Sequence, residues 1–241
     1  MQVITIAVNK GGTGKTTTAA ALAHAAALRK RKVLAIDLDP QANLTYTLGA
    51  SSKVPGSYEL LTGQETALQH ITPRLDAIAA SLNLANITTA PGSAKRLEQA
   101  LKPLTGQYDL IIIDTPPTIG EMQYNALQAS TGLLIPLQAS IYSLQSLYQM
   151  ADLAAVIKKS NPQLQVLGFI LTQHSARSVI ARQMEQTITE KAAAVGIPYK
   201  GAIRKAVAVE EATALQKSLF DYAPKSNPAQ DYITLAKALH L

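Results

Sequence analysis

The chain has 241 residues, of which 47% are hydrophobic, enough to bury the core of one sizeable α/β domain. It contains no cysteine, which excludes disulfides, iron–sulfur clusters and thiolate metal sites. No apolar run approaches the length of a membrane span. The net charge is +6, and residues 158–241, with 11 Lys/Arg and 6 Asp/Glu, carry +5 of it. This asymmetry suggests an anionic partner, nucleic acid or lipid, although a merely solubilising surface gives the same pattern.

Short apolar, β-rich runs alternate with longer helical patterns along the whole chain. The predicted strands are residues 3–8, 32–37, 75–79, 109–114, 132–136 and 164–171. The predicted helices are residues 15–30, 94–102, 121–129, 143–159, 181–195 and 228–239. Because strands covered on both faces are apolar almost throughout, this alternation predicts a three-layer α/β fold, a mostly parallel twisted sheet with helices on both faces. No linker divides the chain, so we expect a single domain, residues 1–241, with a surface turn at residues 51–57.

The residues between the first predicted strand and the first predicted helix form a phosphate-binding pattern. Residues 9–17 read Asn-Lys-Gly-Gly-Thr-Gly-Lys-Thr-Thr. Gly11, Gly12 and Gly14 let the backbone curl around a phosphate with its N–H groups facing inward, and the following helix adds its positive dipole end. The strand–loop–helix context separates a P-loop from a glycine-rich turn with incidental lysines. The sequence therefore predicts a P-loop NTPase fold.

The side chains of this loop have separate predicted roles. Lys15 reaches the β- and γ-phosphates, the Thr16 hydroxyl ligates Mg²⁺, and Thr17 hydrogen-bonds the α-phosphate. The predicted nucleotide-binding residues are Lys10, Gly11, Gly12, Thr13, Gly14, Lys15, Thr16 and Thr17.

Acidic residues follow two of the predicted strands. Asp37 and Asp39 come after residues 33–36, and Asp114 comes after residues 110–113. The carboxyl ends of parallel strands converge near such a loop, and Mg²⁺ prefers oxygen ligands and retains waters that carboxylates hold. We therefore predict that Asp114 is a Walker B acid and that Asp37 holds Mg²⁺ through water, with a strand-end solubility role as the alternative for Asp37. The predicted metal-binding residues are Thr16, Asp37 and Asp114.

The phosphate loop departs from the general pattern in one place. Asn9 occupies the position of the first glycine, and an additional lysine, Lys10, precedes the Gly-Gly pair. This form resembles the deviant Walker A motif of the ParA/MinD family, in particular ParA/Soj partition proteins. The resemblance implies ATP and Mg²⁺ as cofactors and a homodimer in which Lys10 contacts the partner's nucleotide. It also implies that Asp39 is the switch I aspartate that positions the attacking water, with Lys10, Lys15 and Asp39 as the catalytic residues.

Two segments of the last third also resemble Soj-like proteins. Residues 171–177 and 203–212 match segments that carry basic residues for DNA binding without sequence preference. The resemblance implies Arg177 and Lys205 as the DNA-binding residues, although Lys205 stands where arginine is usual and Arg204 where proline is usual. A lysine keeps the charge but loses the guanidinium fork, and solvated surface charge is the alternative reading. The candidate neighbours of this surface are Arg182, Lys200 and Arg204.

Together, the motifs and the resemblance predict a plasmid or chromosome partition ATPase that hydrolyses ATP to ADP and phosphate. We expect an ATP-dependent homodimer that binds double-stranded DNA non-specifically, and a ParB-like partner that stimulates hydrolysis. The expected location is cytoplasmic and nucleoid-associated. Because the first predicted strand begins near residue 1, no N-terminal helix-turn-helix domain is expected.

The alternative is a MinD-like, membrane-associated switch. That function needs a basic amphipathic helix, whereas residues 233–241 have apolar residues at helical spacing but only one lysine. We therefore expect this tail to pack against the domain, without stable membrane association. A nitrogenase-reductase relative would need cluster-ligating cysteines, and a tyrosine autokinase would need a terminal tyrosine cluster, so both are disfavoured.

Overall fold

The computed structural model describes residues 1–90 and 92–241. In these residues the strands form one eight-stranded sheet in the order β3-β4-β2-β5-β1-β6-β7-β8. Neighbouring strands run parallel, except that β3 is antiparallel to β4. The strands are β1 (Gln2–Ile6), β2 (Val33–Asp37), β3 (Gln69–Thr72), β4 (Leu75–Ile78), β5 (Leu110–Asp114), β6 (Gly132–Gln138), β7 (Gln165–His174) and β8 (Tyr199–Arg204).

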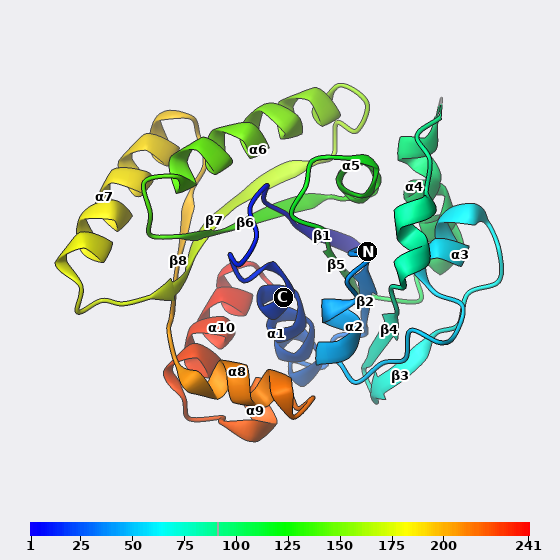
Figure 1. The fold of residues 1–241 in the computed structure, drawn as a ribbon, viewed down its shortest axis with the longest axis horizontal. Helices are drawn as coiled ribbons and strands as arrows, with labels where there is room; N and C mark the ends of the chain where they lie inside the picture. The colour runs from blue at the N-terminus through cyan, green and yellow to red at the C-terminus, as the bar shows by residue number, and fades with distance from the viewer. Residues whose placement is uncertain (91) are drawn as a thin grey trace.

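Helices cover both faces of this sheet (Figure 1). The described α-helices are α1 (Lys15–Leu28), α2 (Asn43–Thr47), α3 (Ser57–Thr62), α4 (Arg96–Leu101), α5 (Glu121–Gln128), α6 (Ser143–Lys158), α7 (Val179–Ala194), α8 (Val207–Ala214), α9 (Leu219–Tyr222) and α10 (Asn227–Ala238). One face carries α1, α2, α8, α9 and α10, and the other carries α3 to α7. No helix among the described residues combines the length and the apolar character that crossing a membrane requires.

Successive residues of the central strands point toward opposite helical layers. In β2, Val33 and Ala35 belong to the core cluster around α1, whereas Leu34 and Ile36 belong to the cluster with α3, α4 and α5. All four residues are fully buried. A side-chain period of two with both faces covered explains why these strands are apolar throughout. The predicted three-layer α/β fold is confirmed.

The strand register brings the glycine-rich loop and the acidic strand ends together at one edge of the sheet. Asp114, the last residue of β5, pairs with Ile6 of β1 and with Asp37 of β2. Residues 7–14 continue from β1 and lead into α1 at Lys15. Since the carboxyl ends of parallel strands form a common edge, this row of three residues sets the position of the site.

The predicted strands and helices are all present, and their ends differ from the structure by at most three residues. The sequence analysis missed β3 and β8, which are the two edge strands of the sheet. Both are only partly buried, and β8 contains Lys200, Gly201 and Arg204. An edge strand needs no continuous apolar run, so its pattern is weak. The short helices α2, α3, α8 and α9 were also missed.

The surface turn predicted at residues 51–57 is only partly correct. Residues 51–55 are exposed, but Gly56 and Ser57 are buried and Ser57 begins α3. A Cβ atom added to Gly56 would lie 2.0 Å from the carbonyl oxygen of Ala79. Because that oxygen belongs to the backbone, only a main-chain shift could relieve the overlap.

A Gly56→Ala variant is therefore expected to lose about 2–3 kcal/mol of unfolding free energy, which urea denaturation measures. Gly120→Ala is the matched control, since Gly120 has an extended φ of 177° and a Cβ there meets no atom within 4 Å. Equal stability of Gly56→Ala and the unmodified chain would show that the 56–79 contact is not tight.

Candidate nucleotide-binding site

The loop between β1 and α1 turns through two left-handed residues. Gly12 has φ 71° and Gly14 has φ 80°, a backbone region that only glycine adopts readily. A Cβ on Gly14 would also lie 3.3 Å from Cγ2 of Thr172, so both the conformation and the space favour glycine. The loop delivers the chain to the N-terminus of α1 at Lys15, where the first N–H groups have no acceptor within the helix. Such an N-terminus is suited to bind an anion.

Side chains at the ends of β6 and β7 hydrogen-bond to the backbone of this loop. The Thr172 hydroxyl donates to the carbonyl oxygen of Thr13 at 2.7 Å. The side-chain amides of Gln138 and Gln173 both donate to the carbonyl oxygen of Gly12, at 2.9 and 3.0 Å. These three hydrogen bonds occupy the carbonyl oxygens of Gly12 and Thr13 and so fix the backbone conformation of the loop. The sequence analysis missed all three residues; their only signal was a polar residue at the end of an apolar strand.

A pocket of about 460 Å³ lies against the phosphate loop, within the range of about 300–1,000 Å³ typical of small-molecule sites. Residues 11–17 and Asp39 line it, together with side chains from α2, α8 and the end of β7. A second pocket of about 110 Å³ adjoins it and shares Gly14, Thr17 and Gln173. The two pockets are therefore neighbours that share part of their lining.

The two lysines of the loop lie in different environments. Lys15 is buried and its Nζ donates to the carbonyl oxygen of Lys10 at 2.9 Å. Burial lowers the pKa of Lys15, and the charges of Asp114 and Asp39 oppose this shift. Lys10 is half-buried; its Nζ donates to the Ser140 hydroxyl at 3.3 Å and lies 5.7 Å from the ring centre of Tyr142. Within one chain Lys10 therefore rests on the segment before α6.

Asp114 is fully buried and contacts the first turn of α1 through Thr16, which lines the pocket. The Thr16 hydroxyl donates to Oδ2 of Asp114 at 2.6 Å. Burial raises the pKa of Asp114 well above its usual range, and the charge of Asp37 raises it further, while Thr16 and Lys15 act in the opposite direction. A buried carboxylate with acidic neighbours is stabilised by any added positive charge.

Asp37 and Asp39 point in different directions. Oδ2 of Asp37 accepts from the backbone N–H and the hydroxyl of Thr45 at 2.8 and 2.7 Å, and its Oδ1 accepts from the Asp39 N–H at 3.0 Å. Burial raises the pKa of Asp37 to about 6. Asp37 thus braces the segment that leads into α2 and is not among the residues that line the pocket, whereas Asp39 is.

The donor set fits Mg²⁺ better than a metal that needs a full protein cage. Among residues 1–90 and 92–241, no three His, Asp or Glu side chains are gathered in an arrangement that could hold a metal ion. Mg²⁺ characteristically takes one or two protein ligands and keeps several waters. The Thr16 hydroxyl beside the buried Asp114 carboxylate offers such a ligand pair.

The two predicted DNA-binding residues lie on adjacent loops. Arg177 is exposed in the turn between β7 and α7, and Lys205 is exposed just after β8. The Lys205 N–H donates to the carbonyl oxygen of His174 at 3.1 Å, which holds the two loops side by side. Arg182, in the first turn of α7, donates to the carbonyl oxygen of Ala176 at 2.7 Å. The structure therefore brings Arg177, Lys205 and Arg182 to one surface.

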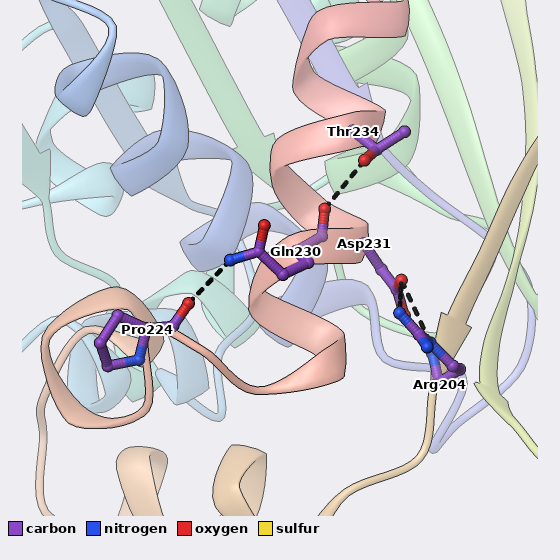
Figure 2. A network of polar contacts seen from close by, with 5 residues as sticks. All are labelled: Arg204, Pro224, Gln230, Asp231 and Thr234. Carbon is purple, nitrogen blue, oxygen red and sulfur yellow. Dashed lines mark hydrogen bonds and ion pairs between the residues drawn. The ribbon is translucent and has the colours of Figure 1, made fainter.

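The other two candidate neighbours do not join this surface. Arg204 forms a two-point ion pair with Asp231 of α10, with Nη2 to Oδ1 at 2.6 Å and Nε to Oδ2 at 3.0 Å (Figure 2). Its charge is therefore neutralised within the chain. Lys200 lies near the start of β8, at the opposite end of the strand from Lys205.

Comparison with known proteins identifies relatives of this chain. The family model described as an AAA domain matches residues 1–166. The chromosome-partitioning ATPase Soj of Thermus thermophilus is 34% identical over 97% of this chain and 93% of its own, and the chromosome partitioning protein ParA of Myxococcus xanthus is 32% identical over 99% and 87%.

Solved structures give the same result. The ATP complex of a Cyanothece McdA variant superposes with a TM-score of 0.88 at 25% identity, covering 100% of this chain and 97% of the other. MinD of Pyrococcus horikoshii with Mg-ADP superposes with a TM-score of 0.80 at 26% identity, covering 99% and 95%. The full-length matches to Soj and ParA, together with the deviant phosphate loop, show that this chain belongs to the ParA/Soj family of partitioning ATPases.

Proposed function

We propose that this chain is a ParA-type partition ATPase whose MgATP lies in the 460 Å³ pocket. The observation that carries the proposal is the convergence of one phosphate loop, the buried Lys15, the Thr16–Asp114 pair and Asp39 on a single pocket. Magnesium-dependent release of phosphate from ATP by the purified chain is the direct test, and no release above the buffer blank would contradict the proposal.

Each side chain has a defined part in this proposal. The Lys15 ammonium neutralises the β- and γ-phosphates, and the N–H groups at the start of α1 bind their oxygens. Mg²⁺ would be held by the Thr16 hydroxyl and the Asp114 carboxylate, with Asp37 contributing through water, and it would supply further charge neutralisation. Oδ1 of Asp39 accepts a hydrogen bond from the Gln41 N–H at 2.9 Å. This bond orients the Asp39 carboxylate at the pocket wall, where it positions the attacking water.

Lys10 is proposed to act across a homodimer. In the single chain its Nζ contacts Ser140 and Tyr142, and Tyr142 and Ile141 are 69% and 71% exposed. This half-buried lysine beside exposed apolar side chains supports a surface that a second copy covers. When two chains meet across this surface, Lys10 leaves its own segment and reaches the partner's nucleotide.

The dimer is proposed to bind double-stranded DNA through Arg177 and Lys205, in the cytoplasm and on the nucleoid, until a ParB-like partner stimulates hydrolysis. Support comes from two exposed cations on adjacent loops, in the part of the chain that carries most of the net charge. Binding without sequence preference needs only positive charge matched to phosphates.

A double variant, Arg177→Glu with Lys205→Glu, is expected to weaken DNA binding at least about tenfold at low salt and to lower the salt slope by about two. Gel shifts at several salt concentrations measure both quantities. Lys158→Glu, at the exposed end of α6 that leads to the start of β7, is the control. Arg177→Glu alone should leave basal ATPase unchanged. DNA binding equal to that of the control would dismiss this surface.

The MinD-like alternative is not favoured by the C-terminal helix. The apolar residues of α10, including Tyr232, Leu235 and Ala236, are buried in the core cluster that contains α1. A helix that inserts into a bilayer must present that face to lipid. Co-sedimentation with anionic vesicles in the presence of ATP distinguishes the two functions: we expect the chain to stay in the supernatant.

A further inference from the structure

The 110 Å³ pocket beside the phosphate loop is bounded by the end of an edge strand. It shares Gly14, Thr17 and Gln173 with the phosphate pocket, and the rest of its lining is Thr172, residues 203–206, Val209, Glu210 and Tyr232 of α10. If phosphates lie on the loop, as the proposed function requires, the rest of the nucleotide must enter an adjoining space. The other neighbour of Thr17 is a crevice of only about 30 Å³, room for about two waters.

The wall formed by residues 203–206 is attached to α10 by four hydrogen bonds from Arg204 to Asp231, three from the guanidinium and one from the backbone. Asp231 accepts from the Arg204 guanidinium at 2.6 Å through Nη2 and at 3.0 and 3.2 Å through Nε. It also accepts from the Arg204 backbone N–H at 2.9 Å. Figure 2 shows the guanidinium and the carboxylate facing each other between the end of β8 and α10. A carboxylate that binds side chain and backbone of one residue fixes position as well as charge.

The two partners differ in how firmly the fold holds them. Arg204 ends β8, the last strand at its edge of the sheet, and its side chain is 45% exposed. Asp231 is only 13% exposed and precedes Tyr232, which is buried and contacts the Thr18 hydroxyl of α1 at 3.2 Å. The amide of Gln230 also donates to the carbonyl oxygen of Pro224 at 2.9 Å, bracing the start of α10 (Figure 2). The pair therefore ties the end of an edge strand, where the chain lines the pocket, to a buried part of α10.

We propose that Arg204 and Asp231 are positioning residues that hold residues 203–206 as the wall of the pocket for the base and ribose of the nucleotide. This inference rests on the proposed function. The guanidinium acts through the backbone that it anchors and does not touch the phosphates. Loss of the guanidinium leaves residues 203–206 unanchored. The nucleoside then loses contacts with them, while the phosphates keep their contacts with the phosphate loop.

The test compares two probes, ATP and inorganic tripolyphosphate, which carries the phosphates without a nucleoside. In Arg204→Ala and Asp231→Asn, the Kd for ATP with Mg²⁺ is expected to rise about five- to tenfold, and the Kd for tripolyphosphate to stay within about twofold. Arg204→Lys keeps the charge but loses the fork, so its ATP Kd should fall between those of the unmodified chain and Arg204→Ala. Lys237→Ala, an exposed charge removed from the same helix, is the matched control.

A charge exchange, Arg204→Asp with Asp231→Arg, restores the side-chain pair without the backbone contact and is expected to recover part of the ATP affinity. Unchanged ATP affinity in both single variants would overturn the proposal, as would an equal rise in Kd for both probes, because that indicates general loosening of the fold. Failure of the unmodified chain to bind either probe contradicts the proposed function itself, and the two failures are thereby distinguished.

Discussion

Replacing Lys15 with alanine is expected to abolish measurable ATP turnover and to weaken MgATP binding by about 30- to 150-fold, since a buried charge-assisted contact is worth about 2–3 kcal/mol. Lys15 is 7% exposed, and its ammonium donates to the Lys10 carbonyl oxygen of the phosphate loop at 2.9 Å. Without it, the carboxylates of Asp114 and Asp39 face the phosphates with less compensating charge. Titration calorimetry and phosphate release measure the two effects.

The control for this variant is Lys159→Ala, which removes an exposed lysine just after α6. Circular dichroism should show that Lys15→Ala keeps the fold, because the burial that lowers the pKa of Lys15 makes its charge costly in the empty site. ATP affinity equal to that of Lys159→Ala would remove the phosphate loop from the proposed mechanism.

Replacing Asp39 with alanine is expected to slow hydrolysis about 100-fold, in line with the loss of a positioned group that acts on the attacking water. ATP binding and the ATP-held dimer should persist, because the phosphate loop and Lys10 are untouched. Asp39 lines the pocket, and its contact with the Gln41 N–H lies on the chain leading to α2. Phosphate release gives the rate, and light scattering gives the mass of the complex.

Asp152→Ala, at an exposed position on α6, is the control for Asp39→Ala. Full turnover by Asp39→Ala would show that this carboxylate does not position the water. Loss of ATP binding together with turnover would instead assign Asp39 to nucleotide binding.

The sequence predicted the centre of the site because its parts are consecutive residues or strand ends. Gly12, Gly14 and Lys15 lie in one loop, so their spacing alone carries the phosphate-binding pattern. Asp114 follows a strand that is apolar because both faces are covered, and the parallel register places it opposite Ile6. Local spacing and strand periodicity were sufficient for these residues.

Contacts between distant segments could not be predicted in this way. The bonds from Thr172 and Gln138 to the phosphate loop span 159 and 126 residues, and their geometry depends on strand order. The pairing of Arg204 with Asp231 depends on α10 packing beside an edge strand that had no apolar pattern. The position of Asp37 at the end of β2 does not reveal that its carboxylate accepts from Thr45, because that contact depends on how the following segment folds back.

The central claim is that residues 11–16 hold the terminal phosphates of ATP and that Lys10 of a second copy completes the pocket. Light scattering during titration with Mg²⁺ and a slowly hydrolysed ATP analogue tests it most directly. The account predicts a saturable rise from the 25.6 kDa monomer to twice that mass, absent with ADP and absent in Lys10→Ala. A mass that stays at the monomer value at saturating analogue would contradict it.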